Sequence, residues 1–183
     1  CSGLQILAGL ARDKKTAQLV NVIPSPRPQD AYKVVAEVSK WNIPDRIRPV
    51  WDRKCVKRTV MTIPYNAKPF SNRTYIRDAL EEKDVKIGKE NLTITVQAVR
   101  MAMDKVVPGP MSVMKWIESE VSKVIRSGAE SLSWETPSGF KVVQRLNKRE
   151  MQTIKLQLLG RCELQVANEG DKVSILRHKA ATA

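Results

Sequence analysis

Arg53, Lys57 and Tyr65 are the residues of this 183-residue chain whose types and spacing point most directly to chemistry. On a helix, the step from Arg53 to Lys57 turns by about 40° and the step to Tyr65 adds about 80°, so the three side chains would line one sector of roughly 120°. Met61 falls between Lys57 and Tyr65. A guanidinium, an ammonium and a phenol in this order suit the phosphates, and then the sugar and base, of a nucleoside triphosphate.

Pro64 predicts that this helix pauses just before Tyr65. A proline has no N–H to bond the carbonyl of Val60, and its ring disfavours the helical conformation at Ile63. Asn66 tolerates the left-handed conformation better than most residues, so a hinge is expected beside Tyr65. An ordinary basic amphipathic helix that ends at a proline fits the same spacing, and the spacing alone does not decide between the two interpretations.

The charge of the chain favours a polyanionic partner, because 32 Lys and Arg outweigh 19 Asp and Glu and leave a formal net charge of +13. Six cations and one carboxylate fall close together, namely Arg46, Arg48, Arg53, Lys54, Lys57, Arg58 and Asp52. Recognition of phosphates requires such a local cluster. Arg46, Arg48 and Arg58 are therefore candidate nucleic-acid-binding residues. A basic helix on a membrane surface would also need a wide apolar face, and prolines interrupt this segment.

The cysteine and histidine content argues against zinc sites and disulfide frameworks. Cys1, Cys55 and Cys162 are odd in number and widely spaced, and His178 is the single histidine. Such a set lacks the close pairs of a zinc site and favours a reducing compartment. It also offers no credible Ser/His/Asp or Cys/His catalytic arrangement. No apolar run approaches the roughly 20 residues that span a bilayer.

The sequence predicts an α+β fold that is mainly α. Helical patterns cover 2–12, 30–42, about 51–63, 69–83, 90–107 and 111–128, with Asp30 or Ser25 as a cap for the second of these. Connectors are expected at 21–30 and 43–51, and a firm break at 107–110. After residue 128 the residue pattern becomes that of strands. It predicts a β-hairpin over 129–146, a strand over 151–166, a turn at 167–172 and a returning strand at 173–179.

The segment "VKRTVMTIPY" at 56–65 resembles the fingers helix of the polymerase-A superfamily, and in particular that of the single-subunit RNA polymerases of bacteriophages and mitochondria. Met61 favours the RNA polymerases, since DNA polymerases of the superfamily tend to carry an aromatic residue there. "CSGLQ" at 1–5, "NVIPSPRPQDAYKVVA" at 21–36, "WETPSGFKVVQ" at 134–144 and "LRHKAATA" at 176–183 resemble further motifs of this family in the same order. The resemblance covers essentially the whole chain.

The resemblance implies template-directed RNA synthesis from ribonucleoside triphosphates. Arg53 and Lys57 would hold the triphosphate next to Met61, and Lys57 would also protonate the leaving pyrophosphate. Tyr65 would sense the 2′-OH side of the site and gate the template base. His178 would lie near the growing end of the transcript. The family has a glycine where this chain has Asn66, which bears on the choice of ribose.

The same resemblance divides the chain into palm-derived helices and connectors at 1–50, fingers helices at 51–127, and a β-rich segment at 128–183 that includes a promoter-reading hairpin at about 150–177. It implies Mg²⁺ as cofactor, with both metal-binding aspartates outside these residues, so the chain alone is expected to be inactive. The implied partners are template and promoter DNA, nascent RNA and ribonucleotides, without a membrane, in a monomeric parent enzyme. The phage lineage predicts the cytoplasm of an infected bacterium rather than a mitochondrion.

Two alternatives remain open at this stage. One is a non-enzymatic nucleic-acid-binding module that uses the cationic cluster at 46–58. The other is a DNA polymerase fragment of the same superfamily, which would prefer deoxynucleotides.

Overall fold

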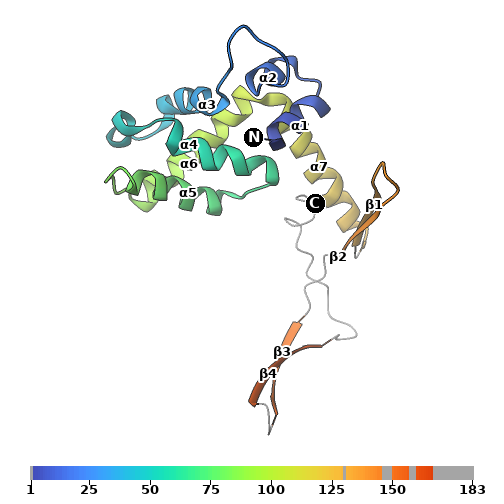
Figure 1. Cartoon of the computed structure of the whole chain (residues 1–183). Coiled ribbons are helices and arrows are strands. Elements are labelled where there is room, and N and C mark those ends of the chain that lie inside the picture. The colour runs from blue at the N-terminus through green and yellow to red at the C-terminus, as the bar shows by residue number, and fades with distance from the viewer. Residues whose placement is uncertain (1, 130, 146–149, 157–159, 167–183) are drawn as a thin grey trace. The chain divides into compact units, whose positions relative to one another are not determined.

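The computed structural model describes residues 2–129, 131–145, 150–156 and 160–166. The chain divides into two compact units, residues 1–116 and residues 117–183 (Figure 1). Helices make up the described part of the first unit, and two antiparallel hairpins account for the strands of the second. The predicted mainly helical α+β class is therefore confirmed.

The first unit is a succession of short helices. They are α1 (Ser2–Leu10), α2 (Lys14–Leu19), α3 (Ala31–Ser39), α4 (Arg53–Thr62), α5 (Pro69–Glu81) and α6 (Lys89–Val106), with 3-10 helices η1 (Lys40–Asn42), η2 (Asp45–Val50) and η3 (Ile63–Tyr65) between them. Helix α7 (Pro108–Arg126) begins in this unit and continues into the second. No helix of the described residues is both long enough and apolar enough to span a membrane.

The core of the first unit forms where α3 packs on α4 and α4 on α5, and where α3 and α5 pack on α6. Leu92, Val96, Val99 and Met103 of α6 are all buried, as their helical spacing predicts. From α4, Val56 and Val60 are fully buried in the same core. Burial of one face of α4 leaves its other face free to present polar groups.

Aspartate side chains start three of these helices. Asp13, Asp30 and Asp52 each accept hydrogen bonds from backbone N–H groups in the first turn of α2, α3 and α4 respectively. These bonds satisfy donors that have no partner inside the helix, and the negative charge suits the helix N-terminus. Of the two caps predicted for the second helix, Asp30 is the one observed.

The second unit contains the end of α7 and four strands. Strand β1 (Ser131–Glu135) pairs antiparallel with β2 (Lys141–Arg145), with Ser133 opposite Val143. The turn between them includes Gly139 at φ 80°, which confirms the predicted hairpin. Strand β3 (Glu150–Leu156) pairs antiparallel with β4 (Gly160–Val166). The predicted turn at 167–172 and returning strand at 173–179 lie outside the described residues.

Three local predictions need correction. Helix α2 was not expected. Asp13 caps its start, Ala17 is buried, and the chain reverses direction after it at Asn21. The second connector contains the 3-10 helix η2. The break at 107–110 shrinks to Val107, because α7 starts at Pro108. Prolines fit the first turn of a helix, where the missing N–H has no partner in any case.

Candidate functional site

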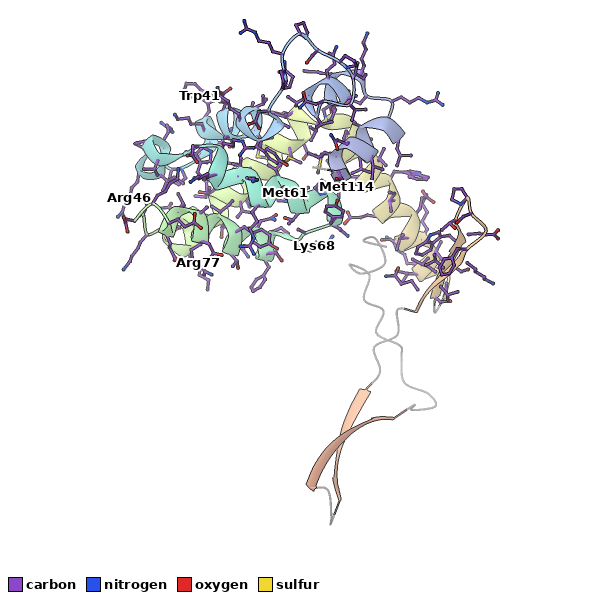
Figure 2. The ribbon with its side chains drawn as sticks, in the orientation of Figure 1. Trp41, Arg46, Met61, Lys68, Arg77 and Met114 are labelled. Carbon is purple, nitrogen blue, oxygen red and sulfur yellow. The ribbon has the colours of Figure 1, made fainter. Side chains whose placement is uncertain are left out.

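Helix α4 presents the predicted site residues on its exposed face. Asp52 starts the helix by accepting the N–H groups of Lys54 at 2.9 Å and Cys55 at 3.3 Å. One side of the helix is buried through Cys55, Val56, Thr59 and Val60, and the other side exposes Arg53, Lys54, Lys57, Arg58 and Met61. Met61, labelled in Figure 2, is 40% exposed. The amphipathic pattern of this segment thus positions a cationic face toward solvent.

The pause before Tyr65 is present. Regular α-helix ends at Thr62, and Ile63–Tyr65 forms a 3-10 turn with Pro64 at its centre. Asn66 closes the turn in the left-handed conformation, with φ 62° and ψ 29°. Its N–H donates to the carbonyl oxygen of Ile63 at 2.8 Å. The predicted interruption and the predicted left-handed residue are both confirmed.

The segment after this turn is anchored to α6. Arg100 donates through Nη1 to the carbonyl oxygen of Ala67 at 3.1 Å and to Oδ1 of Asn72 at 2.9 Å. Lys68 donates to Oδ1 of Asn66 at 2.6 Å. These bonds hold the chain between the 3-10 turn and α5.

Tyr65 lies against helix α1. A Cβ atom placed on Gly3 would be 3.2 Å from Cζ of the Tyr65 ring and 2.9 Å from Cβ of Pro64. The hydrogen side chain of Gly3 therefore permits the close approach. Tyr65 remains 55% exposed. Gly3 of α1 and the end of the α4 segment, far apart in sequence, are thus neighbours.

Arg53 is held by two residues at the start of α3. Its Nε lies 2.6 Å from Oδ2 of Asp30, and its guanidinium carbon lies 5.0 Å from the centre of the Tyr32 ring. Burial acts to raise the pKa of Asp30, but the hydrogen bond from Arg53 and the backbone N–H groups of α3 lower it overall. Burial raises the pKa of Tyr32. Asp30 was predicted from the sequence only as a cap. The pairing of Asp30 with Arg53 was missed because opposite charges 23 residues apart carry no local signal.

Arg53 and Lys57 border different hollows. Arg53 lines one of about 410 Å³ together with Asn21, Gln29, Asp30 and Tyr32. Lys57 and Met61 line another of about 340 Å³, whose wall includes Asp78 of α5. Lys57 has no ion pair with any residue that the structure describes. Its ammonium is therefore available to an anionic ligand.

The arginines predicted to contact nucleic acid differ in their surroundings. Arg48 pairs with Asp45 at 2.6 Å and donates to two backbone carbonyl groups, which stabilises η2. Arg58 stacks on Tyr75, 4.4 Å from the ring centre, and lies 3.7 Å from Asp78. Arg46 is exposed, as labelled in Figure 2. His178 lies outside the described residues.

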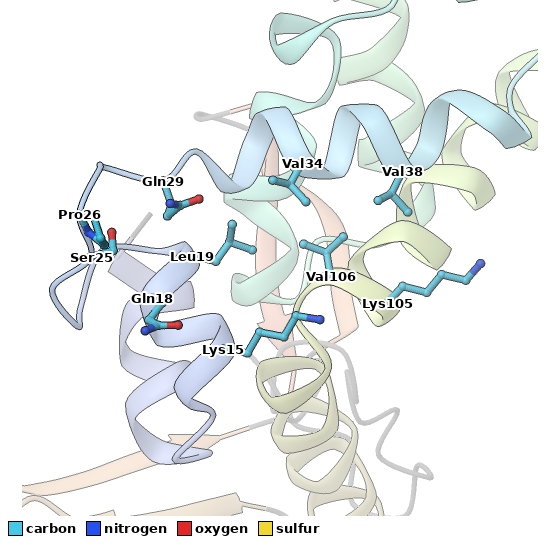
Figure 3. Close-up of a pocket in the computed structure, with 10 residues that line it drawn as sticks. All are labelled: Lys15, Gln18, Leu19, Ser25, Pro26, Gln29, Val34, Val38, Lys105 and Val106. Atoms are coloured by element: carbon cyan, nitrogen blue, oxygen red, sulfur yellow. The ribbon is translucent and has the colours of Figure 1, made fainter.

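Figure 3 shows a third hollow, of about 630 Å³. Leu19, Val34 and Val106 gather at its floor, and Lys15 and Lys105 extend in the same direction beside them. Leu19 and Gln29 line this hollow and the Arg53 hollow alike. Among the residues that the structure describes, no group of three or more His, Cys, Asp or Glu side chains could hold a metal ion.

Comparison with known proteins gives a consistent result. A family model described as DNA-dependent RNA polymerase matches residues 1–183. DNA-directed RNA polymerase 2A of Nicotiana tabacum is 30% identical over 201 residues, which cover 99% of this chain and 59% of that protein. DNA-directed RNA polymerase 2, chloroplastic/mitochondrial, of Arabidopsis thaliana is 29% identical over 201 residues, which cover 99% of this chain and 20% of that protein. DNA-directed RNA polymerase 3, chloroplastic, of Nicotiana sylvestris is 30% identical over 202 residues, which cover 99% of this chain and 20% of that protein.

These relatives correct one prediction and set one limit. A phage origin and the cytoplasm of an infected bacterium were predicted, and this is wrong, because the relatives are plant enzymes named for chloroplasts and mitochondria. The chain spans 59% of one of these relatives and about a fifth of the other two.

Proposed function

Because this chain belongs to the family of DNA-dependent RNA polymerases, we propose that it is the nucleotide-binding part of a longer enzyme that synthesises RNA on a DNA template. The names of its relatives support a plastid or a mitochondrion as the place where that enzyme works. In this proposal residues 1–50 belong to the palm, residues 51–127 form the fingers, and the β3–β4 hairpin reads the promoter.

The observation that carries the proposal is the exposed cationic face of α4, which ends at the Tyr65 turn. Arg53, Lys57 and Met61 lie on that face, and their side chains are open to solvent. An arginine fork matches the oxygens of a phosphate, and a lysine that forms no ion pair with a described residue supplies a point charge. The proposed ligand is the triphosphate of a ribonucleotide that lies along α4 toward Tyr65.

The proposed reaction is nucleotidyl transfer. The 3′ hydroxyl oxygen of the transcript attacks the α-phosphorus of the nucleotide and loses its proton to water, and the bond from this phosphorus to the pyrophosphate oxygen breaks. Lys57 stabilises the charge that develops on the pyrophosphate and donates a proton to it. Arg53 orients the phosphates, and Tyr65 contacts the sugar near its 2′ position.

Mg²⁺ would supply charge neutralisation and activation of the attacking hydroxyl group in such an enzyme. The described residues do not fit it, since no group of three metal-ligating side chains is present among them. Its ligands are therefore proposed to lie outside this chain, and no step above depends on them.

Photocrosslinking tests the proposal. In the full-length protein that carries these residues, a photoreactive analogue of ATP should label peptides between residues 53 and 65, and unlabelled ribonucleotides should compete. Lys57→Ala should reduce the labelling at least tenfold, since a hydrogen bond to a charged group is lost. Lys89→Ala, which removes an exposed lysine at the start of α6, is the matched control and should label normally.

Two results would contradict the proposal. Labelling that an oligonucleotide blocks but ribonucleotides do not would indicate a module that only binds nucleic acid. Competition by deoxynucleotides in preference to ribonucleotides would indicate a DNA polymerase.

A further inference from the structure

We propose that Asp30 and Tyr32 are positioning residues, which hold the Arg53 guanidinium in the orientation that receives a nucleotide phosphate; this inference rests on the proposed function. The two residues belong to the start of α3, whereas Arg53 is the first residue of α4. The packing of α3 on α4 brings them together.

Arg53 is restrained on one edge and one face. Nε is 2.6 Å from Oδ2 of Asp30, and the Tyr32 ring lies under the guanidinium with 5.0 Å between the guanidinium carbon and the ring centre. Among the described residues, no hydrogen bond occupies the two terminal nitrogens of Arg53. These nitrogens form the fork that binds two phosphate oxygens, so the restraint leaves the ligand-binding edge open.

The carboxylate of Asp30 is held in place by bonds that do not involve Arg53. Its Oδ1 accepts the N–H groups of Tyr32 at 3.0 Å and Lys33 at 3.2 Å, and Oδ2 remains for Arg53. The preceding residue is also fixed, because the side chain of Asn21 both donates to and accepts from the backbone of Gln29, each at 2.8 Å. The helix cap and the Asn21 bridge thus set the position of the carboxylate, and through it that of the guanidinium.

Stabilisation of the fold does not account for this arrangement. The side chains of Arg53 and Asp30 are 44% and 38% exposed, and an ion pair this open to water contributes little to stability. The benefit is expected on binding. An arginine that is already ordered loses less side-chain entropy when the phosphate arrives.

The hollow of about 410 Å³ that Arg53, Asp30 and Tyr32 share supplies the approach for the phosphate. Asp30 neutralises part of the arginine charge, which weakens the attraction for anions in general. The carboxylate lies on the Nε side, and an anion can approach favourably at the terminal nitrogens. Asp30 therefore lowers the affinity of Arg53 for anions in general but restricts the direction from which an anion binds. Such a restriction suits a triphosphate that must be aligned for reaction.

Substitutions at Asp30 separate positioning from capping. Serine caps a helix about as well as aspartate, but its hydroxyl oxygen is one bond closer to the backbone and does not reach Arg53. In the full-length polymerase, Asp30→Ser should raise the KM for ribonucleotides about tenfold, with kcat changed less than about threefold. Asp30→Asn keeps one acceptor oxygen for the cap but places an NH2 group, which donates and does not accept, next to Nε, so it should raise the KM about as much as Asp30→Ser.

Asp104→Ser is the matched control for the loss of an exposed ion pair. Asp104, on α6, is 44% exposed and pairs at 2.8 Å with Lys115, on α7. Its substitution should leave the KM within about twofold of the parent value. Thermal unfolding of each variant, followed by circular dichroism, verifies that the variant is folded and as stable as the parent.

A double-mutant cycle supplies the decisive readout. If Asp30 acts through Arg53, Asp30→Ser should add less than about twofold to the KM of an Arg53→Ala enzyme, whereas independent effects would multiply. Tyr32→Leu should behave in the same way, and it carries the test if Asp30→Ser does not fold.

The possible results distinguish this inference from the proposed function. If neither Arg53→Ala nor Lys57→Ala changes the KM, the proposed function is wrong. If Arg53→Ala raises the KM but Asp30→Ser leaves it unchanged or lowers it, only the positioning role is wrong. A lowered KM would mean that Asp30 competes with the phosphate for Arg53.

Discussion

The ring of Tyr65 rests on the backbone of Gly3, so close that a Cβ atom at Gly3 would be 3.2 Å from the ring. Helix α1 therefore fixes one side of the residue that ends the α4 segment. This relationship joins the first residues of the chain to the predicted sugar end of the site, and it can be tested by substitution.

Gly3→Ala should displace Pro64 and Tyr65, because the added methyl group would also lie 2.9 Å from Cβ of Pro64. We expect a loss of about 1–3 kcal/mol in the free energy of unfolding, measured in urea, despite the higher helix propensity of alanine. Gly9→Ala is the control on the same helix, since nothing lies within 4 Å of its Cβ position. It should be neutral or stabilising, and equal effects of the two substitutions would disprove the contact.

Tyr65→Phe should relax the choice of sugar in the full-length polymerase. The hydroxyl group is proposed to lie on the 2′ side of the nucleotide, and a site that hydrogen-bonds a substrate group discriminates through that bond. The ratio of kcat/KM for ribonucleotides to that for deoxynucleotides should fall at least tenfold. A ratio unchanged within error, with normal incorporation of ribonucleotides, would remove Tyr65 from sugar selection.

Asn66→Ala should destabilise the protein by about 1 kcal/mol, because alanine disfavours the left-handed conformation that Asn66 adopts at φ 62°. Asn66→Gly should cost less, although it also loses the hydrogen bond from Lys68. Urea unfolding of the two variants gives the comparison. If glycine proves as costly as alanine, the side-chain bonds of Asn66 matter more than its backbone conformation.

Acid should weaken the fold through the helix-capping aspartates. Burial acts to raise the pKa values of Asp13, Asp30 and Asp52, but their hydrogen bonds lower all three below the ordinary value of 3.8. Groups with lowered pKa values bind fewer protons in the folded state, so their stabilisation is complete above about pH 4–5 and is lost as the pH falls through the folded values.

The test is the free energy of unfolding in urea between pH 7 and pH 2. Asp52→Asn, which also loses the ion pair with Lys83 at 2.7 Å, should flatten this pH dependence. Glu37→Gln, on the exposed face of α3, serves as the control. A parent protein whose stability rises on acidification below pH 4 would contradict the assignment.

Local signals were sufficient for much of the fold. The apolar spacing of Leu92, Val96, Val99 and Met103 fixed α6 as a helix although its β-branched residues also suit a strand, because only a helix buries all four together. The effect of Pro64 on its own segment was equally predictable, since a proline acts through its own ring and missing N–H group.

Local signals could not predict contacts between residues that are far apart in the sequence. The contact of Gly3 with Tyr65 and the pair of Asp30 with Arg53 join residues that only the packing of α1, α3 and α4 brings together. Helix α2 was missed because six residues carry too short a pattern for a period to be recognised. The exposed face of α4 was predictable from its spacing, whereas the separation of Arg53 and Lys57 into two hollows depends on α3 and α5.

The bonds from Arg100 to Ala67 and Asn72 have a mechanical consequence. They hold the chain just beyond Asn66 to α6, so a displacement of the Tyr65 backbone must be taken up by the few peptide units between Thr62 and Ala67. A movement of the tyrosine would therefore change the backbone angles of this turn while α4 and α5 keep their places.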